Sequence, residues 1–128
     1  MNKIVLSFLA LLCCINIQAG VKLQKQGSAT QLVVNDKPML LLAGELSNSA
    51  ATSPADIRKA LKQMKNSGVN SVFVPAYWEF AEPNEGKYDF ALVDSVITTA
   101  RKHDLKIVFL WFGAWKNSMS CYAPLWVK

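Results

Sequence analysis

Residues 68–74 read Gly-Val-Asn-Ser-Val-Phe-Val, and this short apolar run after a glycine decides how the rest of the sequence is organised. Its nearly continuous apolar character is typical of a strand that is buried on both faces, as strands in parallel sheets are. Two further runs share this character, residues 39–42 (Met-Leu-Leu-Leu) and residues 106–110 (Lys-Ile-Val-Phe-Leu). The sequence therefore predicts strands at Met39–Leu42, Val69–Val74 and Lys106–Leu110.

An amphipathic helix is predicted in each interval between these strands. Ser53 is a suitable N-cap for the first helix, because Pro54 follows it and Asp56 completes a capping box. Gly68 is typical of the end of that helix. The second helix is expected to begin at Asp89, and its apolar stripe consists of Leu92, Val93, Val96, Ile97 and Ala100. An alternating order of strands and helices predicts parallel strands joined by right-handed crossovers.

The length of the repeating unit narrows the choice of fold. The distance along the chain is 33 residues from Met39 to Val72 and 35 residues from Val72 to Ile107. A (β/α)8 barrel uses about 250 residues for eight units, or about 31 residues per unit. We therefore predict an α/β chain whose residues 39–128 are the truncated N-terminal part of a TIM barrel, with about three strands and two helices. A small open α/β sheet is the alternative.

Residues 20–38 are predicted to form a separate β segment before the barrel. The residues Asn-Asp-Lys-Pro at positions 35–38 are a turn signal between two apolar runs. We expect this turn to join Leu32–Val34 to Met39–Leu42 in a short β-hairpin.

Residues 1–19 have the pattern of a secretory signal peptide. Lys3 precedes an apolar run at Ile4–Ile15, and Ala19 is the expected cleavage site. The apolar run is shorter than the roughly 20 residues of a membrane-spanning helix. We therefore expect a periplasmic or secreted protein with no stable membrane span after cleavage. The alternatives are an uncleaved anchor, a buried N-terminal helix, or lipid attachment at Cys13 or Cys14.

Composition excludes several other classes of function. The formal net charge is +5, and the basic residues are spread along helix faces, so no nucleic-acid partner is expected. The sequence contains no phosphate-binding glycine loop, HExxH, CxxC or GxSxG motif, so neither a cofactor nor a metal is expected. Cys121 would be the single cysteine after signal cleavage, and we expect it to be a buried or semi-buried structural thiol.

Acidic and aromatic residues follow all three predicted strands. Ligands of parallel α/β folds bind at the carboxyl ends of the strands, and aromatic rings with carboxylates suit sugar rings and their hydroxyls. The alternatives are that Glu45 caps a loop and that the aromatic rings cover the core. Glu82, which precedes Pro83, is expected to hold its loop by hydrogen bonds to the backbone. The candidate sugar-binding residues are Glu45, Trp78, Glu79, Trp111 and Trp115.

Residues 77–90, Tyr-Trp-Glu-Phe-Ala-Glu-Pro-Asn-Glu-Gly-Lys-Tyr-Asp-Phe, resemble the segment after the second barrel strand of β-galactosidase-type hydrolases. Glycoside hydrolase families 35 and 42 both carry versions of this E-P-x-x-G-x-Y-D-F segment. Residues 110–117 and 122–124 resemble a bacterial subgroup of these proteins. The chain departs from the usual family 35 pattern at Ala81, where a histidine is common, and it lacks a G-P-Y run after the third strand. Galactosides and related β-glycosides therefore both remain candidate substrates.

The resemblance implies a retaining glycoside hydrolase that acts on an oligo- or polysaccharide. In such enzymes one glutamate is the acid/base and a second is the nucleophile, with carboxyl groups about 5 Å apart. In the relatives these glutamates lie at the ends of strands four and seven, beyond the three strands expected here. No catalytic residue is therefore assigned in this chain, and we expect it to be inactive alone. The alternative is a non-catalytic carbohydrate-binding α/β domain.

Overall fold

The computed structural model describes residues 20–116 and 121–128. The predicted signal peptide, residues 1–19, lies outside the described residues. The chain divides into two compact units, Met1–Leu40 and Leu41–Lys128. No helix in the described part is both long enough and apolar enough to cross a membrane.

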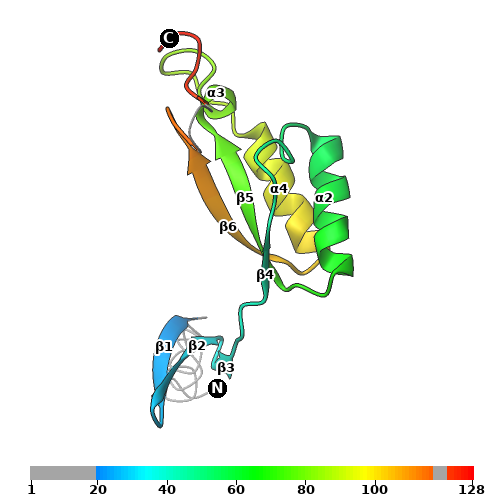
Figure 1. Cartoon of the computed structure of the whole chain (residues 1–128), viewed down its shortest axis with the longest axis vertical. Coiled ribbons are helices and arrows are strands. Elements are labelled where there is room, and N and C mark those ends of the chain that lie inside the picture. Colours follow the sequence, from blue (N-terminus) through cyan, green and yellow to red (C-terminus); the bar gives the residue numbers. More distant parts are fainter. Residues whose placement is uncertain (1–19, 117–120) are drawn as a thin grey trace, which may run out of the picture. The chain divides into compact units, whose positions relative to one another are not determined.

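The first unit contains a three-stranded antiparallel sheet (Figure 1). Its strands are β1 (Val21–Gln26), β2 (Ala29–Val34) and β3 (Lys37–Pro38). The predicted turn between β2 and β3 is confirmed, because Asn35 and Asp36 have φ angles of 52° and 59°. Positive φ at both central residues is the requirement of a tight two-residue hairpin turn. Asp36 also accepts a 2.7 Å ion pair from Lys22, which lowers the pKa of its carboxyl group.

The prediction that Met39–Leu42 is a buried strand is wrong. The partner of β2 is Lys37–Pro38, and the exposed fractions of Leu40, Leu41 and Leu42 are 79%, 50% and 53%. The first parallel strand is instead β4 (Ala43–Glu45), in residues expected to form a loop. Strand formation depends on a partner strand as well as on apolar composition, and only Ala43–Glu45 is in register with the next strand.

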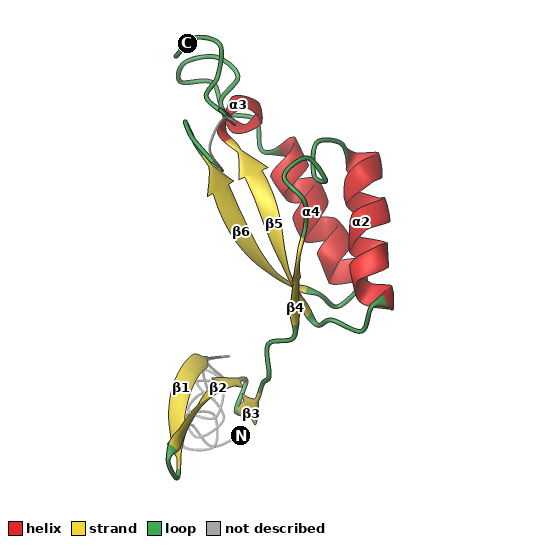
Figure 2. Ribbon diagram, in the orientation of Figure 1, coloured by secondary structure: helices red, strands yellow, loops and turns green. Residues whose placement is uncertain are grey.

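The second unit is a parallel sheet with two long helices (Figure 2). The strand order is β4, β5 (Ser71–Tyr77), β6 (Lys106–Phe112). Helix α2 (Pro54–Asn66) connects β4 to β5, and helix α4 (Ala91–Lys102) connects β5 to β6. The predicted alternation of strands and helices is therefore confirmed, although the first strand begins later than expected.

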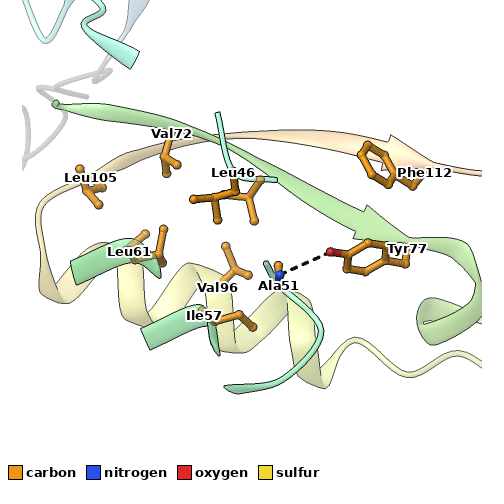
Figure 3. Close-up of a cluster of buried hydrophobic side chains, with 11 residues drawn as sticks. Leu46, Ala51, Ile57, Leu61, Val72, Tyr77, Val96, Leu105 and Phe112 are labelled. Carbon is orange, nitrogen blue, oxygen red and sulfur yellow. Dashed lines mark hydrogen bonds between the residues drawn. The ribbon is translucent and has the colours of Figure 1, made fainter. Parts of the chain in front are cut away.

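The core of this unit lies between the sheet and the two helices (Figure 3). The predicted apolar stripes of both helices face it, since Ile57 and Leu61 of α2 and Val96 and Ala100 of α4 are buried. The beginning of α2 is as predicted, because the Ser53 hydroxyl accepts a 3.2 Å hydrogen bond from the Asp56 amide. Capping and periodicity are local properties, so the sequence places this helix well.

Strands β5 and β6 extend further than predicted. Strand β5 continues through Pro75 to Tyr77, and β6 continues to Phe112, with Tyr77 and Phe112 in register. Proline was expected to end the strand, but its φ near −65° is compatible with extended backbone, and it removes only one hydrogen-bond donor. A one-turn helix, α3 (Trp78–Ala81), then replaces the start of the expected loop.

Candidate functional site

The carboxyl ends of β5 and β6 carry most of the candidate residues. Tyr77 and Phe112 are the last residues of these strands and lie in register, so the segments that follow begin at the same edge of the sheet. Trp78 and Glu79 form the first turn of α3, directly after β5. This edge is the position at which parallel α/β folds bind ligands.

Trp78 is held by the carboxylate of Glu82. The Trp78 Nε1–H donates a 2.8 Å hydrogen bond to Glu82 Oε2, and the Gly86 amide donates a 2.9 Å bond to Glu82 Oε1. Gly86 has a φ of +70°, a conformation that glycine adopts without strain. The prediction that Glu82 organises its loop through hydrogen bonds is confirmed, and Glu82 also orients the Trp78 indole.

The segment 121–128 folds onto this loop, which the sequence reasoning did not foresee. Tyr122 O accepts a 2.9 Å hydrogen bond from the Glu79 amide, and Glu82 O accepts a 3.0 Å bond from Trp126 Nε1. The Trp78 and Trp126 rings are perpendicular, with an interplanar angle of 89° and centroids 5.9 Å apart. The aromatic residues that follow the third predicted strand were the available signal for these contacts.

Tyr77 connects the end of β5 to the loop after β4. Its buried hydroxyl donates a 2.7 Å hydrogen bond to Asn48 O and accepts a 3.4 Å bond from the Ala51 amide (Figure 3). Burial raises the pKa of Tyr77, so the phenol remains neutral and can donate this bond at physiological pH. Its ring packs against Phe80, Phe112 and Tyr122, at centroid distances of 5.5, 5.7 and 5.5 Å.

Glu79 lies beside a surface cavity of about 220 Å³, together with Phe80, Pro83, Asp89, Ala91 and Leu92. The amide of Glu79 is held by Tyr122, so the backbone that carries this carboxylate is anchored from two segments. No group of three or more His, Cys, Asp or Glu residues is arranged to hold a metal ion in the described part of the chain.

Residues 31–115 match the family model described as glycosyl hydrolases family 35. The chain belongs to this family. The resemblance noted in residues 77–90 is therefore confirmed at the level of the family.

Solved structures of other glycoside hydrolases show the same fold. Exo-beta-1,4-mannosidase Op5Man5 from Opitutaceae bacterium strain TAV5 is 18% identical, with a TM-score of 0.55, over 70% of this chain and 17% of its own. GH5_18 from Bifidobacterium longum subsp. longum ATCC 55813 is 23% identical, with a TM-score of 0.48, over 62% of this chain and 20% of its own. No curated protein matches.

The predicted fold class is thus confirmed: the parallel unit of this family 35 chain is built as part of a glycoside hydrolase TIM barrel. The chain spans only 17% of the length of Op5Man5.

Glu45 of this family 35 chain does not lie level with Trp78. It is in register with Phe73, four residues before the end of β5, which is about 13 Å along the strand. Register partners share a face, and Gly44 is on the opposite face, where an added Cβ would lie 2.7 Å from Met64 Sδ of α2. Glu45 therefore lies on the sheet face that is turned away from α2.

Trp111 and Trp115 are not drawn into the loop that holds Trp78. Trp111 pairs with Ala76 and shares a face with Phe109, which lines a cavity of about 10 Å³ next to α4. Trp111 is 59% exposed, and Trp115, three residues beyond β6, is 74% exposed. Among the five candidate sugar-binding residues, the structure places Trp78 and Glu79 together.

Cys121 corrects another expectation, because it is exposed rather than buried or semi-buried. In the short segment that contains it, Ala123 and Pro124 occupy the buried positions instead. The thiol therefore makes no contribution to the core.

The loop between Trp78 and Gly86 of this family 35 chain is expected to loosen in acid. Hydrogen bonds from the Trp78 indole and the Gly86 amide stabilise the Glu82 carboxylate and lower its pKa. Because the pKa is lowered by folding, this stabilisation is complete above the ordinary glutamate pKa of about 4.3 and disappears as the pH falls through the lower, folded value.

Nuclear magnetic resonance of the indole N–H groups can measure this transition between pH 6 and pH 2.5. The Trp78 N–H signal should shift toward that of a solvent-exposed indole as Glu82 becomes protonated. Glu82→Gln is the matched control, since its side chain does not titrate. An unchanged pH dependence in that variant would assign the transition to another group.

Proposed function

We propose that this chain forms the first part of the catalytic barrel of a retaining glycoside hydrolase that acts on β-galactosides or related β-glycosides. The observation that carries the proposal is the family 35 match over residues 31–115. The ordered Trp78–Gly86 loop at the carboxyl end of β5 agrees with it. The product of the complete reading frame that contains this chain is called the full-length protein below.

The candidate residues suit the chemistry of a sugar. An indole face can stack on the C–H face of a pyranose, and a carboxylate accepts hydrogen bonds from hydroxyl groups. We assign Trp78 and Glu79 to the wall of the sugar site, with Glu45 deeper on the face turned away from α2. Trp111 and Trp115 remain candidates for parts of the substrate further from this wall.

None of these carboxylates is assigned to bond cleavage. A general acid of a glycosidase needs a pKa that is raised toward neutrality. The pKa of Glu82 is lowered instead, and both of its carboxylate oxygens are occupied by protein donors. Glu82 is therefore unsuited to protonate a leaving group, and we place the catalytic pair outside this chain.

The test is a comparison of two proteins on p-nitrophenyl β-D-galactopyranoside and the corresponding β-glucoside and β-mannoside. We expect the full-length protein to release nitrophenol from at least one of them. We expect residues 20–128 alone to release none. A full-length protein that binds these sugars without hydrolysing any would instead favour a non-catalytic carbohydrate-binding protein. Protein-dependent hydrolysis by residues 20–128 would contradict the placement of the catalytic pair.

A further inference from the structure

Glu82 binds the indole N–H groups of two tryptophans from different parts of the chain. Its side-chain Oε2 accepts from Trp78 Nε1 at 2.8 Å, and its backbone oxygen accepts from Trp126 Nε1 at 3.0 Å. Trp78 follows β5, whereas Trp126 lies beyond β6 and 44 residues from Glu82. One residue therefore connects two segments that lead away from neighbouring strands.

These hydrogen bonds decide which chemistry the two indoles can offer to a ligand. An indole has one donor and no acceptor, so each ring has used its only polar group within the protein. Trp126 is nevertheless 40% exposed, and Trp78 is partly exposed. What the rings present to solvent is therefore aromatic carbon.

The arrangement of the rings is a corner. Their planes meet at 89°, and their centroids are 5.9 Å apart. Two perpendicular apolar faces can contact two sides of a ligand whose surface is rich in C–H groups, as the faces of a pyranose are. A flat or fully polar ligand would contact only one of the two faces.

The corner is fixed before any ligand binds. The Gly86 amide holds the second carboxylate oxygen of Glu82 at 2.9 Å, and the Glu79 amide is bound to Tyr122 O at 2.9 Å. Both tryptophans are thus anchored through the backbone of the opposite segment as well as through their own N–H groups. Fixing the rings in this way lowers the entropy that a ligand must cost on binding.

We infer that Trp78 and Trp126 form one aromatic corner that binds the C–H face of a pyranose, and that Glu82 is the positioning residue that sets the angle between the two rings. This inference rests on the proposed function, because it assigns a ligand to the same site. It adds Trp126, which the sequence did not single out, as a substrate-contacting residue. Glu82 acts through the two tryptophans and touches no substrate.

The test uses the full-length protein, with lactose as the probe and calorimetry to measure its dissociation constant. Trp126→Ala should weaken lactose binding roughly two- to tenfold, the loss expected for one aromatic contact. Trp126→Phe should weaken it less, because a ring remains but its bond to Glu82 O is lost. Leu125→Ala is the matched control, since Leu125 precedes Trp126 and is 86% exposed. Circular dichroism checks that each variant is folded.

Glu82→Gln tests the positioning role separately. The amide offers one acceptor oxygen to the two donors, Trp78 Nε1 and Gly86 N, that share the carboxylate. We expect the Trp78 indole N–H resonance to shift in the absence of sugar, and lactose binding to weaken in the same direction as in Trp126→Ala. A shifted resonance with unchanged lactose binding would overturn the positioning role.

The outcomes separate this inference from the proposed function. Lactose binding without hydrolysis of any β-glycoside, weakened by Trp126→Ala, would support the corner and contradict the hydrolase. Hydrolysis of β-glycosides with lactose binding unaffected by Trp126→Ala in a folded variant would overturn the corner alone. Absence of lactose binding by the unaltered full-length protein would also overturn it.

Discussion

Leu61→Ala is expected to lower the free energy of unfolding by about 2–5 kcal/mol. Leu61 lies on the inner face of α2 with 0% exposure, and it belongs to the cluster that includes Ile57, Val72 and Val96 (Figure 3). Removing its isobutyl group loses transfer free energy and leaves a cavity, because helices on a packed sheet relax only partly. The helix itself should persist, since alanine has the highest helix propensity.

Urea denaturation of the full-length protein can measure this loss as a lower midpoint at an unchanged slope. The matched control is Lys62→Ala, which alters the next residue on the exposed face of the same helix. Its effect should stay within about 0.5 kcal/mol. Equal effects of the two substitutions would mean that Leu61 does not lie in the core as described.

Residues 20–128 expressed alone are expected to aggregate or to remain molten. In the described residues β6 pairs only with β5, and its side chains Val108, Phe109 and Trp111 are 40%, 37% and 59% exposed. A groove of about 530 Å³ beside this strand is lined in part by Ile97 and Ile107. An exposed apolar edge strand is a template for pairing with other molecules.

Light scattering, near-ultraviolet circular dichroism and binding of a hydrophobic dye measure these properties together. The full-length protein is the comparison, and it should show a native near-ultraviolet spectrum and little dye binding. Val108→Lys in the short chain should slow aggregation, because a charge on an edge strand opposes pairing. A cooperative thermal transition of the unaltered short chain, with native near-ultraviolet signals, would show that it folds independently.

The helices were the part of the fold that the sequence predicted best. The N-cap at Ser53 and the apolar periodicity of both helices depend on residues within three or four positions of one another. Such interactions form within one segment, so no knowledge of distant residues is needed. The beginning of the second helix was less accurate, because the Asp89 side chain accepts from the Ala91 amide and so precedes α4 at Ala91.

The strands were less predictable, because a strand is defined by its partner. Met39–Leu42 is more apolar than Ala43–Glu45, yet Ala43–Glu45 pairs with β5. Gly44 permits the close approach of Met64 at this point, a requirement that comes from α2 rather than from the strand itself. A similar argument applies to Pro75, which lies inside β5.

The amino-acid sequence by itself determined the alternation of strands and helices, the caps of α2 and the family-type loop at residues 77–90, because these are patterns of neighbouring residues. Only the tertiary structure decided that Glu45 lies about 13 Å below the edge that carries Trp78. It also decided that Trp126 joins Trp78 through Glu82. Strand register and hydrogen bonds between distant segments depend on how the whole sheet is assembled, and no local pattern encodes them.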